Sequence, residues 1–399
     1  MNFTNKILDL EAKASFDFFW NTASTTEETY GLIPDNTVNH EMCSIASVGF
    51  GLAAITVGVH RGWITREEGE YRAWRTLVTM NTKPDTLHGF YYHFLYMDSG
   101  KRYRGCELSI IDTALLVGGA LCAGSYFGGR VLEEANRMYE RIDWNWYRNP
   151  ETGCFYMGYD DRNNPNRHFG TWDVYAEQLI MYVLACGSPT YPLGKDIYYG
   201  CHMDKGSYGG IADIYHSPGG ALFVYQFSHA FIDFRGKKDA RGIDWFENSV
   251  KATLANRQYC IDHHSQFKTY HANSWGLTAC ETPTGYSGAP GTAPSCVDNA
   301  KINDGTVAPC GAIGSVAFTP KESIEAMEYF AADPKLWCEY GFLDAYNLDV
   351  EPEWYSQMVI GIDKGIGLLM IENLRSGLIW DTMMQHPAIR KGLDVMQIQ

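Results

Sequence analysis

Two kinds of helical pattern alternate along this chain of 399 residues. In the first kind, apolar residues face every direction, as in 44–59, 109–124, 172–185 and 354–373. In the second kind, one apolar stripe runs beside a charged face, as in 65–80, 130–143 and 238–259. A helix that is apolar all round is buried, whereas a helix with one apolar face lies at the surface. The alternation is what two concentric rings of helices would produce.

About twelve such segments predict an all-α fold, and six helical hairpins closing into an (α/α)6 barrel would account for that number. Because no strict sequence repeat accompanies the pattern, a helical solenoid and an irregular bundle are alternatives. No linker or low-complexity segment divides the chain, so residues 1–399 are expected to form a single domain. Long loops rich in Gly, Pro and aromatic residues are expected to form a cleft, at 81–106, 145–171, 187–217 and 261–319.

The charge and the termini narrow the class of protein. A net charge of −15 without clustered Lys and Arg argues against nucleic acid and anionic membrane surfaces as partners. No window approaches 18 uncharged apolar residues, so we expect no membrane span. The N-terminus lacks the pattern of a signal peptide, because Asp9 and Glu11 interrupt it, and we therefore expect a cytoplasmic protein. The sequence identifies no protein partner.

Cofactor and metal motifs are weak. Eleven cysteines without CxxC spacing are typical of reduced core residues. His263, His264 and His271 have no acidic or Cys partner at ligand spacing, and the Gly pairs follow no predicted strand and fit no phosphate-binding motif. We therefore expect neither a metal nor a cofactor.

One carboxylate interrupts the apolar segment 170–193. The expected helix there starts at Thr171 and stops at Cys186, and it places Glu177 on one face with Ile180 and Leu184. An ionised, unpaired carboxylate in such a place is costly, so Glu177 must be paired, protonated or facing a wet cavity. A structural ion pair is the alternative.

Further carboxylates lie on other apolar helices. Asp363 stands in the sequence GIDKG within a long apolar segment, and Glu107 and Asp112 bracket the start of another. Each alone could form a structural ion pair. Together they are what glycosidic hydrolysis requires, because one carboxyl group serves as acid and an opposed one as base or nucleophile.

Several long motifs resemble those of one known family. They include WDVYAEQLIMYVLACGSPTYPL (172–193), YQFSHAFIDFRG (225–236), NSWGLTACETPTGY (273–286) and GIDKGIGLLMIENLRSGLIW (361–380). In order and content they resemble the glycoamylase-like domain, and more narrowly glycoside hydrolase family 144, whose characterised activity is hydrolysis of β-1,2-glucan. The resemblance runs from about residue 5 to the end of the chain.

The resemblance implies an (α/α)6 barrel, an inverting mechanism and a cleft for a β-1,2-linked glucan. By position in the motifs, Glu177 corresponds to the general acid, Asp363 to the base and Asp112 to a further cleft acid, with Glu107 beside it. A general acid must hold its proton near neutral pH, and burial together with the like charge of Asp173 is expected to raise the pKa of Glu177. The lack of an export signal points towards imported oligosaccharides as substrates.

Aromatic and polar residues complete the predicted cleft. We expect Trp172, Tyr175, Trp275 and Tyr286 to stack on sugar rings, and His229 and Arg235 to bond sugar hydroxyls. Burial in the core is the alternative for each aromatic residue, and a buried network between helices is the alternative for the 225–236 motif.

Three other functions compete with β-1,2-glucan hydrolysis. A hydrolase or transglycosylase could act on another glucan linkage. An (α/α)6 sugar epimerase would use two histidines as acid and base, and His229 and His271 are the pair available. A non-catalytic glycan-binding protein would tolerate the loss of Glu177.

Overall fold

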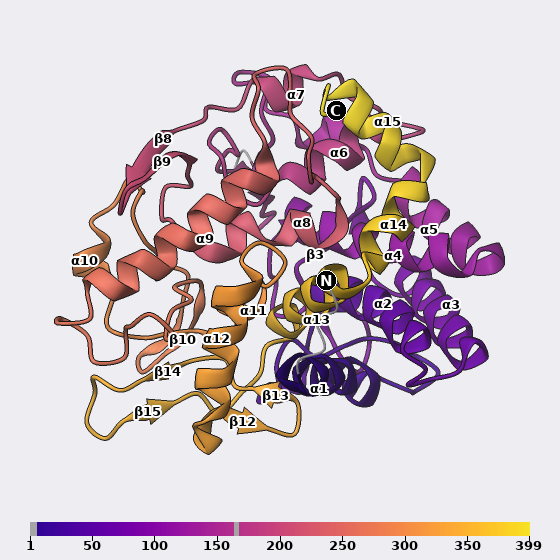
Figure 1. Ribbon diagram of the computed structural model, residues 1–399. Helices are drawn as coiled ribbons and strands as arrows, with labels where there is room; N and C mark the ends of the chain where they lie inside the picture. The colour runs from indigo at the N-terminus through magenta and orange to yellow at the C-terminus, as the bar shows by residue number, and fades with distance from the viewer. Residues whose placement is uncertain (1–5, 163–166) are drawn as a thin grey trace.

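The computed structural model describes residues 6–162 and 167–399, and helices dominate it (Figure 1). The α-helices are α1 (Lys6–Thr22), α2 (Ile45–His60), α3 (Arg66–Thr82), α4 (Ile110–Phe127), α5 (Gly129–Glu140), α6 (Leu179–Gly187), α7 (Asp196–Tyr199), α8 (Phe227–Phe231), α9 (Trp245–Asp262), α10 (Asn299–Ile302), α11 (Pro309–Ile313), α12 (Pro320–Ala331), α13 (Gly361–Arg375), α14 (Leu378–Gln385) and α15 (Pro387–Val395). Three 3-10 helices join them: η1 (Trp144–Tyr147), η2 (Leu222–Tyr225) and η3 (Pro334–Leu336).

The most apolar helices form an inner layer. Helix α2 packs against α4, α4 against α6, α6 against α8, α11 against α13, and α13 back against α2. Between α8 and α11, the Gln226 side chain donates hydrogen bonds to the Gly311 carbonyl and to Ser315 Oγ, both at 2.8 Å. Most residues of α2, α4, α6 and α13 are buried, as expected for helices with neighbours on several sides.

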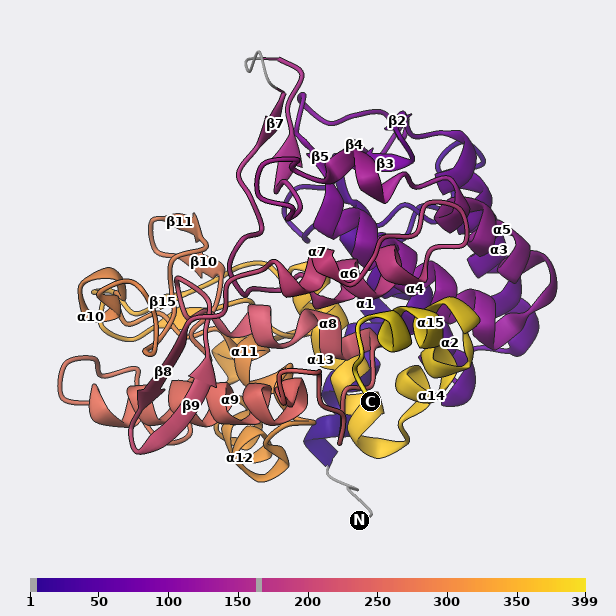
Figure 2. The ribbon, with the colours of Figure 1, turned by 90° about the horizontal axis from the view of Figure 1, so that it is seen from above.

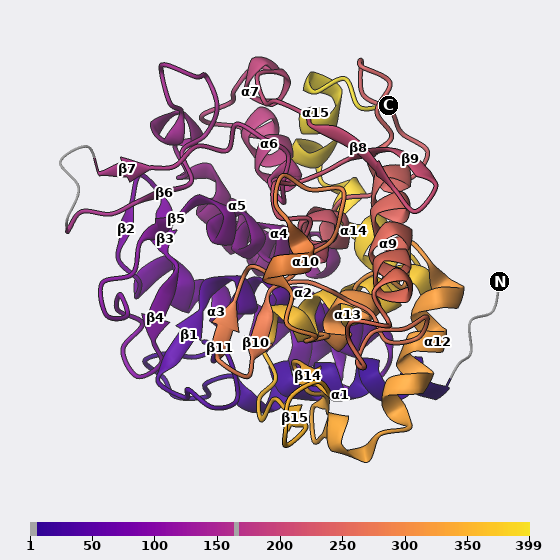
Figure 3. The same cartoon turned by 90° about the vertical axis from the view of Figure 1, so that its left-hand side faces the viewer.

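The half-polar helices form an outer layer. Helix α1 packs on α13 and α2, α3 on α2, α5 on α4, and α12 on α11. Helix α15, from the end of the chain, covers α6, although the two are far apart in sequence (Figure 3). The predicted alternation of buried and half-exposed helices is confirmed as a helix-rich arrangement of two layers.

Two glycines permit the closest approach within the inner layer. A Cβ atom built on Gly119 of α4 would lie 1.8 Å from the backbone oxygen of Gly49 in α2. Since no side chain fits there, the two helix backbones can touch. Gly119 of α4 therefore serves helix packing.

Helix α4 corrects one expectation from the sequence. It has 18 residues with a mean hydropathy of 1.5, and it is long and apolar enough, by length and composition alone, to cross a membrane. Its one acidic residue, Asp112, did not lower the mean enough to prevent this. In the structure 78% of the helix is buried inside the protein, against α2 and α5, as expected of a core helix.

Short strands accompany the helices, which the all-α prediction did not include. They are β1 (Met42–Ser44), β2 (Thr86–Leu87), β3 (Phe90–Tyr92), β4 (Phe94–Tyr96), β5 (Leu108–Ser109), β6 (Gly158–Tyr159), β7 (His168–Phe169), β8 (Lys205–Tyr208), β9 (Ile211–Tyr215), β10 (Cys280–Thr282), β11 (Gly285–Ser287), β12 (Trp337–Cys338), β13 (Gly341–Phe342), β14 (Tyr346–Asn347) and β15 (Trp354–Tyr355). The largest sheet is antiparallel in the order β2-β3-β5-β6-β7, and it pairs Leu108 with Tyr92 on one side and with Tyr159 on the other. Figure 2 shows β2, β3, β5 and β7 together at one end of the molecule. These strands tie down the long loops that the sequence assigned to a cleft.

One hydrophobic cluster runs through the whole chain. It includes Leu8 of α1 at one end and Leu393 of α15 at the other, and both are almost fully buried. Each of the eleven cysteines is a free thiol, and eight of them are buried, as the scattered spacing predicted.

Candidate active site

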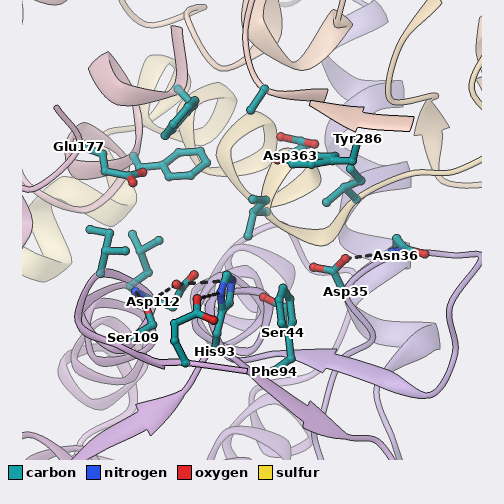
Figure 4. A pocket seen from close by; sticks show the side chains of 18 of the residues that line it. Asp35, Asn36, Ser44, His93, Phe94, Ser109, Asp112, Glu177, Tyr286 and Asp363 are labelled. Carbon is teal, nitrogen blue, oxygen red and sulfur yellow. Dashed lines mark hydrogen bonds and ion pairs between the residues drawn. The ribbon is translucent and has the colours of Figure 1, made fainter. Parts of the chain in front are cut away.

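A cavity of about 610 Å³ opens between the inner helices and the long loops, and five carboxyl groups line it. The ionisable residues of its wall are Asp35, His93, Glu107, Asp112, Glu177 and Asp363. Apolar side chains form much of the rest, including Phe94, Ile111, Leu115, Met157, Phe169, Trp172, Phe223, Phe227 and Met358. Figure 4 shows Glu177 and Asp363 on opposite sides of this cavity. Apolar walls with a few convergent polar groups are typical of a small-molecule site.

Glu177 lies before a helix rather than within one, which corrects the predicted helix at 172–185. The Gln178 side chain accepts a hydrogen bond from the Ala176 amide at 2.7 Å and donates one to the Val174 carbonyl at 2.6 Å. Such side-chain bonds compete with helical hydrogen bonding, so α6 starts only at Leu179. Ser228 of α8 then fixes the Glu177 backbone, because its hydroxyl donates to the Glu177 carbonyl at 2.7 Å.

The Glu177 carboxyl group is held in its neutral form. Burial and, to a smaller extent, the negative charge of Asp112 raise its pKa to about 8, although the positive charge of His93 acts in the opposite direction. The predicted rise in pKa is thus supported, but the like charge comes from Asp112 rather than from Asp173. Within the described part of the chain, the Glu177 carboxyl forms no ion pair. This argues against the alternative that Glu177 has a purely structural role in an ion pair.

Asp363 enters the cavity from the first turn of α13. The backbone N–H of Gly361 donates to the Asp35 carbonyl at 2.7 Å, which anchors this end of the helix beside a second cavity carboxylate. Burial raises the pKa of Asp363 to about 6, although hydrogen bonds from Asp344 and Cys310 act in the opposite direction. The site therefore contains two opposed carboxyl groups with different proton affinities.

Behind Asp363 lies a carboxyl group that sequence reasoning missed. Asp344 is 3% exposed, and one of its oxygens accepts a hydrogen bond from the Glu281 amide at 2.6 Å. Burial and the charge of Asp363 raise the pKa of Asp344 well above its usual value, so Asp344 holds a proton that it donates to Asp363. Two buried carboxylates side by side cannot both ionise, and a shared proton satisfies both.

Cys310 completes this cluster. Its sulfur and one carboxylate oxygen each of Asp344 and Asp363 all lie within 4.8 Å of one another, which is the spacing that a metal ion would need. Burial raises the pKa of the Cys310 thiol well above its usual value, so binding a metal there would require removing both this proton and the one on Asp344. The absence of a metal stays a prediction.

Two acidic residues at the other wall share a histidine. His93 Nδ1 lies 2.7 Å from Glu107, and its Nε2 lies 3.5 Å from Asp112. Asp112 stands in the first turn of α4 and also accepts a hydrogen bond from the Ser109 hydroxyl at 2.5 Å. The backbone N–H of His93 donates to the Glu107 carbonyl at 3.0 Å, so the pairing of two loop segments sets the geometry.

His93 and Asp35 are cavity residues that the sequence did not identify. Asp35 accepts a hydrogen bond from the Asn36 side chain at 2.9 Å, and burial raises its pKa. Both residues lie in segments without helical periodicity, where no pattern distinguishes a cavity residue from a loop residue. The one available signal is that His93 stands among aromatic residues in a long loop.

The predicted aromatic residues divide into two groups. Trp172 and Tyr286 line the cavity, and Tyr286, on β11, is 61% exposed. Tyr175 and Trp275 lie outside it, at 1% and 0% exposure. Tyr175 stacks on Trp245 with ring centroids 4.6 Å apart. For these two residues the core alternative is right, because long aromatic side chains fill the space between the helix layers.

The two predicted ligand contacts of the 225–236 motif lie outside the cavity, although Phe227 of the same motif lines it. His229 is 1% exposed, and burial lowers its pKa to about 3, so the ring is neutral and accepts or donates at Ser249, 3.1 Å away. Arg235 is exposed, pairs with Asp233 at 2.9 Å and covers the Trp380 ring. The expectation that His229 and Arg235 contact a ligand is therefore corrected to the structural alternative. His271 does not line the cavity either, which leaves the epimerase hypothesis without its histidine pair.

Comparisons with known proteins agree with this picture. Residues 170–387 match the Glycoamylase family model, described as "Putative glucoamylase". A crystal structure from Bacteroides uniformis described in the same words is 31% identical, covers 99% of this chain and 97% of its own, and superposes with a TM-score of 0.88. The chain belongs to the glycoamylase family.

Two relatives have named activities. An endo-β-1,2-glucanase from Chitinophaga pinensis, solved with sophorotriose and glucose, is 29% identical over 98% of both chains, with a TM-score of 0.88. An exo β-1,2-glucooligosaccharide sophorohydrolase from Parabacteroides distasonis is 29% identical over 98% of this chain. The chain spans 58% of the length of that relative. The resemblance to glycoamylase-like proteins and to β-1,2-glucan hydrolases is thus confirmed.

Proposed function

We propose that this protein is a glycoside hydrolase that cleaves β-1,2-linked glucan or its oligosaccharides. The observation that carries the proposal is the opposed pair of carboxyl groups in one cavity, Glu177 with a pKa of about 8 and Asp363 with a pKa of about 6. Between these values one group is protonated and the other ionised, which is the state that acid and base catalysis require. The choice of the β-1,2 linkage is inferred from the named activities of the two relatives.

In the proposed mechanism Glu177 donates its proton to the leaving glycosidic oxygen. Asp363 accepts a proton from the attacking water, directly or through a substrate hydroxyl, and the water attacks the anomeric carbon from the face opposite to the leaving group. The neutral state of Glu177 follows from burial, and the anionic state of Asp363 follows from the proton held on Asp344 behind it. Asp112 and Glu107 are placed to accept hydrogen bonds from sugar hydroxyls, and Trp172 and Tyr286 offer faces for stacking.

We also infer that the inner helices close into the six-hairpin barrel and that the whole chain is one domain. Six inner helices, α2, α4, α6, α8, α11 and α13, succeed one another in sequence, and each contacts the next. The main hydrophobic cluster includes residues from both ends of the described chain, which supports one domain.

The experiment that tests the activity is incubation with linear β-1,2-, β-1,3-, β-1,4- and α-1,4-glucans, followed by separation of the products by size. We expect products from β-1,2-glucan or its oligosaccharides alone, without added metal. Cleavage of starch without cleavage of β-1,2-glucan would refute the substrate. Activity that vanishes with a chelator and returns with a divalent ion would instead point to the cluster of Cys310, Asp344 and Asp363.

A further inference from the structure

His93 is the one basic side chain in the cavity wall, within the part of the chain that the structure describes. It shares the cavity with five carboxyl groups, those of Asp35, Glu107, Asp112, Glu177 and Asp363. Neither the sequence patterns nor the names of the relatives assign it a role. Its surroundings are therefore a separate question from the acid and base proposed above.

The His93 ring is held at both nitrogens and on one face. Its Nδ1 lies 2.7 Å from Glu107 and its Nε2 lies 3.5 Å from Asp112, so each ring nitrogen is close to a carboxylate. Figure 4 shows His93 beside Asp112. One face of the ring stacks on Phe94, with centroids 3.8 Å apart and an interplanar angle of 14°. The His93 carbonyl accepts a hydrogen bond from the Ile45 amide at 3.3 Å, which ties it to the start of α2. Nδ1 is hydrogen-bonded to Glu107 and Nε2 is within ion-pair distance of Asp112, which favours the charged imidazolium with a proton on each nitrogen.

We propose that His93 is a positioning residue: its imidazolium holds Glu107 and Asp112 as oriented, ionised acceptors for substrate hydroxyls and offsets the charge of Asp112 at Glu177. The role rests on the proposed function, because it takes Glu177 as the general acid. His93 itself transfers no proton in the reaction. It sets the charge of the wall that faces the general acid.

The electrostatics agree with the geometry. Burial acts to lower the pKa of His93, but the charges of Asp112 and Glu107 and the hydrogen bond to Glu107 outweigh it and raise the pKa to about 9. Burial likewise acts to raise the pKa of Glu107, and the bond to His93 lowers it overall. At Glu177 the two neighbours act in opposite directions, Asp112 raising the pKa and His93 lowering it. Asp35 and Asp363 are the other charged groups of the same cavity.

This opposition provides a test that a purely structural role would fail. The experiment is the pH dependence of kcat on a β-1,2-glucooligosaccharide for the wild type, His93→Gln and Asp112→Asn. The alkaline limb of the profile reports the loss of the Glu177 proton. His93→Gln removes a positive charge and should move this limb to higher pH, whereas Asp112→Asn removes a negative charge and should move it to lower pH, each by about 0.5 pH units or more. Both variants should also raise KM, because each disturbs an acceptor for the substrate.

A matched control is available on the same side of the molecule. His88 lies outside the cavity wall, where its ring is 3.7 Å from Asp143 and stacks on Trp146. His88→Gln should leave the pH profile where it is in the wild type. Limbs that move in the same direction in His93→Gln and Asp112→Asn, or that do not move, would overturn the proposal.

A second measurement separates this inference from the proposed function. NMR titration of histidine rings in the whole protein, with the His93 signal assigned from His93→Gln, should give a pKa near 9 in the wild type and a lower value in Asp112→Asn. This result does not depend on any substrate. A His93 ring that titrates near its ordinary value of about 6.5 would overturn the inference even if β-1,2-glucan were cleaved. A raised pKa without cleavage would instead refute the proposed function.

Discussion

Replacing Glu177 with Gln should abolish activity and, at the same time, stabilise the fold at alkaline pH. The amide keeps the volume of the side chain but has no proton to donate, so turnover should fall by at least about a hundredfold, the lower end of what general acid catalysis contributes. The gain in stability follows from the raised pKa. A carboxyl group that keeps its proton when folded and loses it when unfolded makes unfolding easier as the pH rises.

The magnitude follows from the two pKa values. The folded value of about 8 lies above the ordinary value of 4.5, so the contribution of Glu177 to stability is fully present below pH 4.5 and is lost as the pH rises to about 8. At about 1.4 kcal/mol per pH unit the loss reaches about 4 kcal/mol at pH 8. Because Glu177 is only half-buried and faces an open cavity, solvent screening reduces this to about 2 kcal/mol. Gln does not ionise, so the variant escapes the loss.

The assay is denaturant unfolding of wild type and Glu177→Gln at pH 5 and pH 8. We expect the variant's advantage in free energy of unfolding to grow by about 2 kcal/mol between the two pH values. The control is Glu133→Gln, at an exposed position on α5, which should show no such change. An advantage of Glu177→Gln that is equal at both pH values would refute the account of a half-buried, protonated acid.

Four further predictions follow, three from the same site and one from a buried ion pair next to it. The pH profile of kcat/KM should be bell-shaped, falling below about pH 6 as Asp363 gains a proton and above about pH 8 as Glu177 loses one. Asp344→Asn, which still donates to Asp363, should keep most of the turnover, whereas Asp344→Leu should lose it and move the acid limb to higher pH; equal rates in both variants would contradict the shared proton. Proton NMR in the first minutes of hydrolysis should show the α-anomer from a β-linked substrate, and an initial β-anomer would mean retention. Lys364→Met leaves the buried carboxylate of Glu11 without its partner at 2.9 Å, so denaturant unfolding should show a loss of about 3–5 kcal/mol.

The apolar periodicity of the sequence was sufficient to predict most of the helices and their arrangement in two layers. Thr65 and Ser109 act as helix caps at the starts that the pattern indicates, because capping depends on residues within one turn of each other. The wrong prediction of a helix that begins before Leu179, in the segment 172–185, also has a local cause. Gln178 turns back on the Val174 carbonyl, and apolar periodicity does not register a side-chain bond of that kind.

The site itself was predicted only where a charge interrupts an apolar helical pattern. Glu177, Asp363 and Asp112 are conspicuous because apolar neighbours surround them in sequence. His93 and Asp344 lie in loops and short strands, where polar residues are ordinary and carry no signal. His229 shows the opposite error, since a polar residue in a distinctive motif proved to be a neutral group in the core.

The sequence by itself determined that the chain forms layered helices and that a few carboxylates face away from water or into a cavity. These properties follow from apolar periodicity and from the cost of burying a charge, and both can be recognised from residues that are close together in the sequence. Tertiary structure alone decided which carboxylates share a cavity and which protons they hold. A pKa depends on groups within a few ångströms, and here those groups are far apart in sequence: Asp112 and His93 beside Glu177, and Asp344 beside Asp363.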